Sequence, residues 1–312
     1  MGEPRESPRP PSGLWELAVE GVLLARCALD AGWPRTKLFR RLAGEGWTRI
    51  GGGAWAEPGR TVDLSLRLRA GQLAIPGLVA SHTAAATLWG IEVLRSEPEF
   101  IDPGRSRRRA GARMHWLTLP PRDVTVTRGL RVTTVARTLA DLLRGGPRDE
   151  ALVAVDSALA WRTVGVDRVR RPPLIAAPAI AAALRAPLPG ADTARRRLDL
   201  ADPRAASPAE TVARLRMHDA GLHPSTQAEL LTPSGRRCRP DFLFREEGVA
   251  VEIEGYAYHG TREAHRRDLA RYNDLAACPE VRMVLRFGAE EVLYGPEAFI
   301  EQLKSTLASC RR

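Results

Sequence analysis

Apolar and acidic side chains alternate along Val249–Glu254, and this short pattern constrains the fold more than any other in the chain. Side chains alternate across a β-strand, so Glu252 and Glu254 share one face while Val251 and Ile253 share the apolar face opposite. The apolar face must lie on a hydrophobic core. The pattern therefore predicts a strand of a packed sheet that carries two carboxylates.

A third acidic residue lies near the start of a neighbouring predicted strand. Asp241 follows Pro240 at the start of the apolar stretch 239–244, and a turn at 245–248 joins that stretch to the strand of Glu252. We expect this hairpin to place Asp241 beside Glu252 at the open end of two adjacent strands. Converging carboxylates repel one another unless a cation compensates them, and Mg²⁺ or Mn²⁺ accepts hard oxygen ligands and binds phosphate.

Further polar residues flank this hairpin. Ser207 predicts a helix N-cap, with Pro208 at the first helical position and Glu210 completing a capping box. His259 follows the two glutamates and has the pKa range of a general acid or base. A basic helix comes next, and three of its arginines suit contact with a sugar–phosphate backbone: Arg262, Arg266 and Arg267.

These motifs together resemble a nuclease signature. Pro240-Asp241, ten residues and Glu252-Ile253-Glu254 resemble the PD-(D/E)XK pattern, and the stretch 252–259 is more narrowly similar to very-short-patch-repair-like endonucleases. The resemblance covers the last third of the chain. It implies a mixed four-stranded sheet flanked by helices and Mg²⁺-dependent hydrolysis of phosphodiester bonds.

The same resemblance assigns roles to residues. Asp241 and Glu252 would bind the metal, with the Ile253 carbonyl as a further ligand, and Glu210 would orient or ligate through water. Glu254 and His259 complete the predicted catalytic set, with His259 handling a proton. Two positions depart from the family pattern: Glu254 stands in place of the signature lysine, and Gly288 in place of a small hydroxyl residue.

The N-terminal region has a different character. Apolar spacing predicts a helix over 14–29, a short basic helix over 35–42, and a hairpin from 47–50 and 54–56 around three glycines. Together these predict a winged helix-turn-helix. Its DNA-contacting residues would be basic: Arg35, Lys37, Arg40, Arg41 and Arg49. A solvated basic face on a capping subdomain is the alternative.

The middle region resembles AbiE-type antitoxins. Ser81-His82-Thr83-Ala84-Ala85 and the stretch 132–142 carry the resemblance, and the winged helix before them matches that family's usual N-terminal partner. Strands are predicted over 116–119, 124–127 and 129–133, and helices from 134 to 143 and 149 to 160. Arg137 and Asp141 predict a helix-surface ion pair. We expect no metal or nucleophile arrangement in this region.

A length of 312 residues exceeds what one hydrophobic core usually organises. We expect an α/β, α+β multidomain chain with five parts: a disordered lead (1–12), a winged helix-turn-helix (13–72), an α+β domain (73–163), a connector with short helices (164–206) and an endonuclease-like domain (207–312).

The net charge of +10 favours a polyanionic partner, and double-stranded DNA is the expected one, with a toxin or repair protein as the expected class of protein partner. No apolar run suggests a membrane span, and the four scattered cysteines suggest reduced thiols in a cytoplasmic protein. The sequence thus favours a metal-dependent DNA endonuclease. The alternative is a non-catalytic, antitoxin-type DNA-binding transcriptional regulator whose nuclease domain is degenerate.

Overall fold

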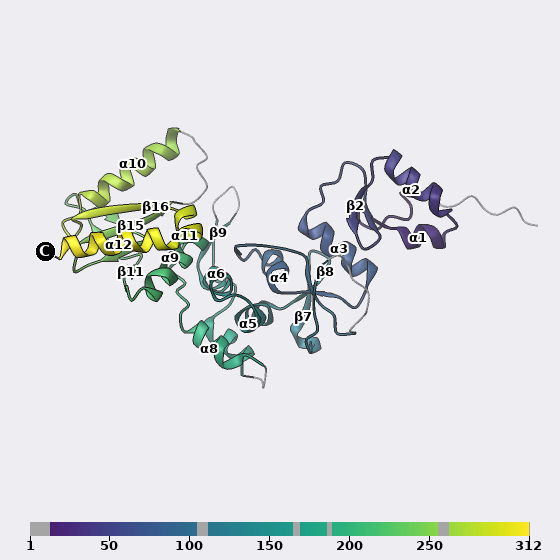
Figure 1. Cartoon of the computed structure of the whole chain (residues 1–312), viewed down its shortest axis with the longest axis horizontal. Coiled ribbons are helices and arrows are strands. Elements are labelled where there is room, and N and C mark those ends of the chain that lie inside the picture. Colours follow the sequence, from purple (N-terminus) through teal and green to yellow (C-terminus); the bar gives the residue numbers. More distant parts are fainter. Residues whose placement is uncertain (1–12, 105–111, 165–168, 186–188, 255–261, 312) are drawn as a thin grey trace, which may run out of the picture. The chain divides into compact units, whose positions relative to one another are not determined.

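The computed structural model describes residues 13–104, 112–164, 169–185, 189–254 and 262–311. It is a mixed α/β protein, in agreement with the predicted class. The chain divides into two compact units (Figure 1). The first holds Met1–Gly90 and Arg95–Thr138, and the second holds Ile91–Leu94 and Leu139–Arg312.

The first unit begins with a small three-stranded sheet. Its elements are β1 (Val22–Leu24), α1 (Ala25–Asp30), α2 (Arg35–Gly44), β2 (Thr48–Gly51) and β3 (Ala54–Ala56). The strands are antiparallel in the order β1-β3-β2. Ala28, Leu38, Leu42 and Trp47 are buried together, so the apolar sides of α1 and α2 share one core. The predicted basic helix and the glycine-linked hairpin are confirmed.

The long helix predicted over 14–29 is wrong. Val22–Leu24 forms β1 and pairs with β3, and only Ala25–Asp30 is helical. Glu20 and Gly21 both have positive φ angles, 49° and 87°, which no α-helix contains. The three consecutive apolar residues after them suit a buried strand as well as a helix, and apolar spacing alone cannot separate the two.

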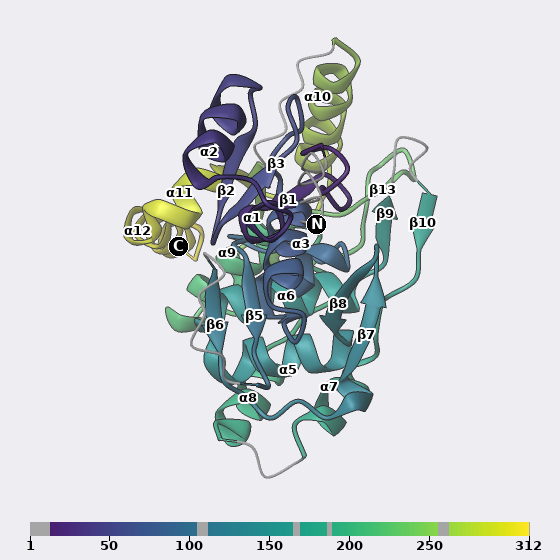
Figure 2. The ribbon, with the colours of Figure 1, turned by 90° about the vertical axis from the view of Figure 1, so that its right-hand side faces the viewer.

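A five-stranded sheet completes the first unit. After α3 (Leu64–Ala74), the chain forms β4 (Val79–Ala80), α4 (His82–Leu88), β5 (Glu99–Ile101), β6 (Arg113–His115), a 3-10 turn η1 (Pro121–Asp123), β7 (Val124–Thr127) and β8 (Leu130–Thr133). The strand order is β6-β5-β4-β8-β7. Figure 2 labels the four outer strands, β6 and β5 on one side and β8 and β7 on the other. Leu68, Leu78, Phe100 and Val132 are buried between the sheet and its helices.

Two predictions for this region are wrong. The strand expected at 116–119 lies at Arg113–His115 instead, because β6 pairs with β5 only as far as His115 and two prolines follow at 120 and 121. Arg137 and Asp141 of α5 (Val135–Gly145) are buried rather than exposed on the helix surface. Arg137 bonds to Asp123 at 3.0 Å, and Asp141 accepts from Arg144 at 3.1 Å.

The second unit contains a helical part built on α6 (Arg148–Leu159). The stretch expected as a connector forms the β9 (Arg162–Val164) and β10 (Val169–Arg171) pair and the short helices α7 (Ala177–Ala183) and α8 (Ala191–Leu198). Asp156 of α6 is buried. Its carboxylate accepts from Thr211 Oγ1 and Arg214 at 2.9 Å and from the Asp202 N–H at 2.8 Å. These bonds tie α6 to the helix that begins the predicted nuclease-like region.

That region is a four-stranded mixed sheet. Its order is β11-β14-β15-β16, from β11 (Ser225–Thr226), β14 (Phe242–Phe244), β15 (Val249–Glu254) and β16 (Met283–Gly288). β15 is parallel to β16 and antiparallel to β14, and β14 is antiparallel to β11. A separate pair is formed by β12 (Leu230–Leu231) and β13 (Arg237–Cys238).

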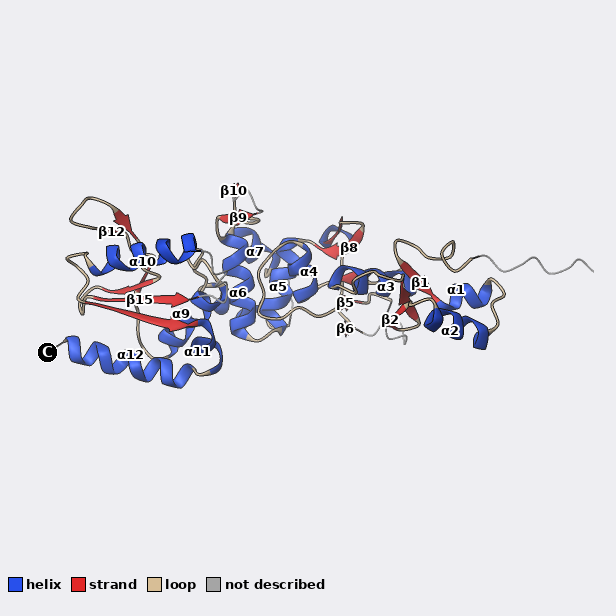
Figure 3. Ribbon diagram, turned by 90° about the horizontal axis from the view of Figure 1, so that it is seen from above, coloured by secondary structure: helices blue, strands red, loops and turns tan. Residues whose placement is uncertain are grey.

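Helices cover both faces of this sheet (Figure 3). Phe242, Val251 and Phe287 bury one face against α9 (Pro208–Asp219), α11 (Ala289–Tyr294) and α12 (Pro296–Cys310). Leu243 and Ala250 pack on the other face with Leu275 of α10 (Arg262–Ala276). The alternation predicted for β15 is confirmed, since Val251 and Ile253 are buried while Glu252 and Glu254 are partly exposed. Among the described residues, no helix is both long enough and apolar enough to cross a membrane.

Candidate functional site

The β14–β15 hairpin brings Asp241 to Glu252, as the sequence predicts. Phe242 pairs with Val251, so Asp241 and Glu252 are the next residues along the same ladder. The Asp241 N–H donates to Glu252 Oε1 at 3.3 Å, and the Ile253 N–H donates to Asp241 Oδ2 at 2.8 Å. The Asp241 side chain is therefore fixed by the backbone of the strand that carries Glu252.

Glu210 reaches the same place from the first turn of α9. Ser207 caps the helix by accepting from the Glu210 N–H at 3.2 Å, so the predicted N-cap is confirmed. The second half of the predicted capping box differs: Glu210 Oε2 accepts from the Ala206 N–H, at 2.8 Å, rather than from Ser207. Glu210 is only 6% exposed, so this carboxylate lies inside the protein.

Gln227 joins Glu210 to Asp241. Its side-chain amide donates to Asp241 Oδ1 at 3.0 Å and to Glu210 Oε2 at 3.3 Å. Its backbone has φ +51°, a left-handed conformation that is costly for a residue other than glycine. The Gln227 N–H also donates to the Asp241 carbonyl at 3.0 Å. Strained residues of this kind cluster at binding and catalytic sites.

Arg271 of α10 supplies the cation of the site. Its guanidinium lies 2.8 Å from Glu252 Oε2 and 3.3 Å from Asp241 Oδ1, and it also donates to the Arg239 carbonyl. The Arg271 side chain is half exposed, whereas the two carboxylates that it contacts are almost buried. It thus lies over the solvent side of the acidic pair.

Burial and mutual repulsion make these carboxyls weak acids. Burial, and next the charge of Asp241, raises the pKa of Glu210 to about 7 and that of Glu252 to about 7. Burial also raises the pKa of Asp241, against the opposing effects of the Ile253 N–H and Arg271. Among the residues that the structure describes, three carboxyls with raised pKa values thus lie together, with Arg271 in contact with two of them.

The remaining predicted site residues are not all brought together. Glu254 forms an ion pair with Arg286, whose guanidinium lies 5.6 Å from the Tyr272 ring centre, so its described partner is another residue of the sheet. His259 lies outside the described residues. Arg262 and Arg267 belong to α10, but their side chains also lie outside the described part. Arg266 is exposed on the same helix.

The basic residues predicted to contact DNA in the first unit are all exposed: Arg35, Lys37, Arg40, Arg41 and Arg49. Lys37, Arg40 and Arg41 are three and four residues apart and so share one face of α2. Arg41 pairs with Glu45 and lies 5.2 Å from the Trp33 ring centre, and Arg35 lies 5.3 Å from that of Phe39. Leu38 and Leu42 on the other side of the helix are buried.

Sequence reasoning missed several polar residues. Gln227 and Arg271 belong to no recognisable sequence motif. Their contacts with Asp241 in the folded structure identify them as part of the site. In the first unit, His82, Glu99 and His115 form a group with metal-ligand character, contrary to the expectation for that region. Three isolated residues from separate elements leave no spacing signal in a sequence.

No family model matches this chain, and a search of curated proteins finds no relative. The assignment of function therefore depends on the arrangement of the residues.

Proposed function

We propose that residues 207–312 form a metal-dependent endonuclease domain with a restriction-endonuclease-like core. The observation that carries this proposal is the convergence of Glu210, Asp241 and Glu252 on one end of the β14–β15 pair. The three acids come from a helix, a strand start and a strand interior. The mixed four-stranded sheet with helices on both faces supports the same proposal.

The donor set fits a hard divalent cation. Carboxylate oxygens are the ligands that Mg²⁺ and Mn²⁺ accept. Burial, and next the charge of Asp241, raises the pKa values of Glu210 and Glu252, and a bound cation would offset that charge. Asp241 and Glu252 would hold the ion, with the Ile253 carbonyl as a further ligand. A bound Mg²⁺ would lower the pKa of a water molecule and offset charge on a phosphate.

Other residues of the chain would position the acids, supply positive charge and transfer a proton. The Ile253 N–H and the Gln227 amide keep Asp241 in place, and Gln227 also orients Glu210. Glu254 occupies the position of the signature lysine, and Arg271 would provide the positive charge of that lysine instead. In the metal-free protein Arg271 partly neutralises the charges of Asp241 and Glu252. His259 would exchange a proton with water or the leaving oxygen.

The first unit would supply recognition of the DNA duplex. A small sheet with two helices, one of which presents Lys37, Arg40 and Arg41 on a single face, supports a winged helix-turn-helix. Such a module would raise the local concentration of duplex DNA near the nuclease domain. The α+β region after it would contact DNA, or a toxin or repair protein, as the resemblance to antitoxins implies.

Nicking of supercoiled plasmid by the full chain tests the nuclease proposal. We expect Mg²⁺ or Mn²⁺ to support nicking and EDTA to stop it. Asp241→Asn should abolish nicking, because it removes the central charge while keeping an oxygen for the Ile253 N–H. Glu297→Gln is the matched control, since Glu297 is an exposed acid of α12.

Cleavage that persists in EDTA and in Asp241→Asn would exclude this proposal. Normal duplex binding with no cleavage under any metal would instead support the second candidate, a DNA-binding regulator with a degenerate nuclease domain. The observation that favours this candidate is the contact of Arg271 with both Asp241 and Glu252, which competes with a bound cation.

A further inference from the structure

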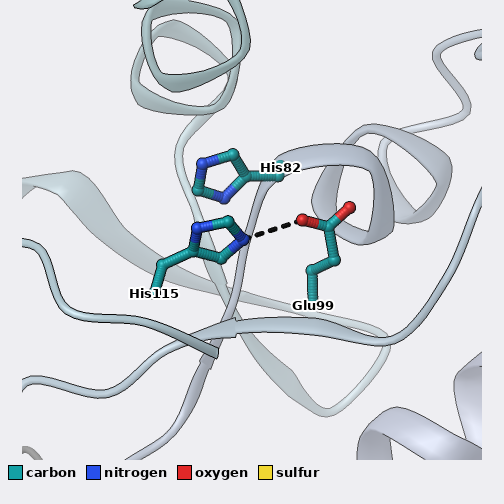
Figure 4. Close-up of side chains that lie close together, drawn as sticks. All are labelled: His82, Glu99 and His115. Carbon is teal, nitrogen blue, oxygen red and sulfur yellow. Dashed lines mark hydrogen bonds and ion pairs between the residues drawn. The ribbon is translucent and has the colours of Figure 1, made fainter. Parts of the chain in front are cut away.

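Two histidines and a glutamate meet at one edge of the five-stranded sheet in the first unit (Figure 4). His82 is the first residue of α4, Glu99 begins β5 and His115 ends β6. β4 pairs with β5, and β5 pairs with β6, so the sheet itself brings the three residues together. One candidate ligand atom of each lies within 4.8 Å of those of the others.

The three side chains already contact one another. His115 Nε2 lies 2.8 Å from Glu99 Oε2, and the rings of His82 and His115 are stacked with centres 3.7 Å apart. Figure 4 shows the Glu99 carboxylate beside the edge of the His115 ring. His82 and Glu99 are 7% and 5% exposed, so these donors lie in a largely dry environment.

Hydroxyl groups of neighbouring residues hold the Glu99 and His82 side chains in position. Thr83 Oγ1 donates to Glu99 Oε1, the oxygen that His115 does not use, and His82 Nδ1 lies 3.0 Å from Ser81 Oγ. The Ser81 N–H donates to the Glu99 carbonyl at 3.0 Å. Metal-binding histidines and carboxylates in proteins are held by outer partners of this kind.

The backbone at His82 is a separate indication of a functional role. Its φ is +50°, in the left-handed region that residues other than glycine adopt at a cost of about 1 kcal/mol or more. Here the conformation occurs at a buried helix start. It places the imidazole against His115 rather than in the solvent.

Two arginines lie near enough to oppose a cation. Both lower the pKa of His82, although each is a smaller influence than burial. Arg113 is exposed to solvent, and Arg137 is paired with Asp123 at 3.0 Å. Water screens the charge of Arg113, and the Asp123 carboxylate offsets that of Arg137, so both repel a nearby cation less strongly.

We propose that His82, Glu99 and His115 bind a first-row divalent metal ion of the zinc type, separate from the acidic site of the second unit. Two imidazoles and one carboxylate suit Zn²⁺ or Co²⁺ better than Mg²⁺, and three protein ligands leave a position for water or another ligand. The stacked rings must turn apart to aim both nitrogens at one ion. His115, whose side chain is 21% exposed, has room for this movement.

Titration of the metal-depleted full chain with Co²⁺ tests the proposal. The Asp241→Asn background removes one of the two acids proposed to hold the ion in the second unit, so it weakens metal binding there and leaves the histidine site intact. We expect one Co²⁺ per chain, with the visible absorption of a four- or five-coordinate nitrogen-containing site, displaced by Zn²⁺ and not by Mg²⁺. His115→Asn and Glu99→Gln should each weaken Zn²⁺ binding by about 100-fold or more, and Thr83→Val by about tenfold.

His223→Asn is the matched control, because His223 lies in the second unit with its ring 5.4 Å from that of His218. It should leave the Co²⁺ spectrum unchanged. The absence of this spectrum in the Asp241→Asn background would overturn the proposal. Zn²⁺ affinity unchanged in both His115→Asn and Glu99→Gln would overturn it too. Because no readout is cleavage, failure here is independent of the nuclease proposal.

Discussion

Asp241 and Ile253 are joined across the β14–β15 pair, because the Ile253 N–H donates to Asp241 Oδ2 at 2.8 Å. This bond connects the carboxylate before one strand to the backbone of the strand that carries Glu252. The spacing of the two acids is thus held by main-chain geometry rather than by flexible side chains. Such a carboxylate is ready to bind a cation without first losing conformational freedom.

Replacement of Arg271 should affect metal binding and cleavage in opposite directions. In Arg271→Ala, Asp241 and Glu252 lose the guanidinium that competes with a metal ion. The Mg²⁺ concentration for half-maximal activity should therefore fall. Cleavage at saturating Mg²⁺ should nevertheless drop by about 100-fold, because the charge facing the phosphate is lost. Arg271→Lys should recover part of this rate. The measurement is plasmid nicking as a function of Mg²⁺ concentration.

Arg245→Ala is the control for this prediction, since Arg245 is exposed and pairs with Glu280 away from the acidic site. It should leave both quantities unchanged. A parallel loss of Mg²⁺ affinity and cleavage in Arg271→Ala would mean that Arg271 only supports the local structure.

The pH should control metal binding at the acidic site. Glu210 and Glu252 have pKa values of about 7, so both are largely protonated at lower pH and must release protons to bind metal. We expect the half-saturating Mg²⁺ concentration to fall by about tenfold or more between about pH 6 and pH 8. An Mg²⁺ requirement that is flat over this range would contradict the raised pKa values.

The same shifts predict how the metal-free protein unfolds. Between the usual glutamate pKa of 4.5 and about 7, the folded state holds more protons than the unfolded state. These two residues therefore make the second unit less stable as pH rises through that window. Without metal, the unfolding temperature should fall as pH rises through that window. Above about pH 7, where the carboxylates are ionised, added Mg²⁺ should raise the unfolding temperature. Glu210→Gln should reduce the slope.

Gln227 should matter through both its amide and its backbone. Gln227→Gly keeps the left-handed conformation without strain but loses the amide that joins Glu210 to Asp241, whereas Gln227→Ala loses the amide and keeps the strain. Both should weaken Mg²⁺ binding by about 10- to 100-fold. The glycine variant should unfold with a free energy about 1 kcal/mol higher than the alanine variant.

Chemical denaturation and the Mg²⁺ dependence of nicking would measure these two effects separately. If the glycine variant binds Mg²⁺ like the original protein, the amide has no part in arranging the acids. In that case Gln227 serves only the turn after β11.

The sequence revealed the acidic site where the signal is local. Strand alternation places Glu252, the hairpin places Asp241 and the Ser207 cap places Glu210, and each of these follows from a few neighbouring residues. Gln227 follows a two-residue strand and Arg271 comes from a distant helix, so only tertiary packing brings them to the acids. The same limit applies to His82, Glu99 and His115, which meet because β4, β5 and β6 pair and α4 begins directly after β4.

The wrong predictions of secondary structure and burial have a similar cause. Val22–Leu24 was expected in a helix because three apolar residues fit both periods, and only pairing with β3 decides between them. Arg137 and Asp141 have the spacing of a surface pair, yet the helix that carries them is buried on that side. Asp123, whose carboxylate accepts from Arg137, comes from a turn 14 residues earlier.

The basic face of α2 should govern affinity for DNA. Arg40→Ala with Arg41→Ala removes two exposed charges from the face shared with Lys37, so duplex binding should weaken, and the slope of log affinity against log salt should decrease by about two. Leu38 and Leu42 hold the helix from its other side, so the double variant should remain folded. Fluorescence anisotropy with a labelled duplex at several salt concentrations measures both quantities.

The charge-matched control is Arg195→Ala with Arg196→Ala, which removes two exposed arginines from α8. It lowers the net charge of the chain equally but leaves α2 intact, so its salt dependence should equal that of the original protein. Equal losses in the two double variants would show that overall charge, rather than the face of α2, attracts the DNA. That outcome would favour the interpretation of α2 as a solvated basic surface.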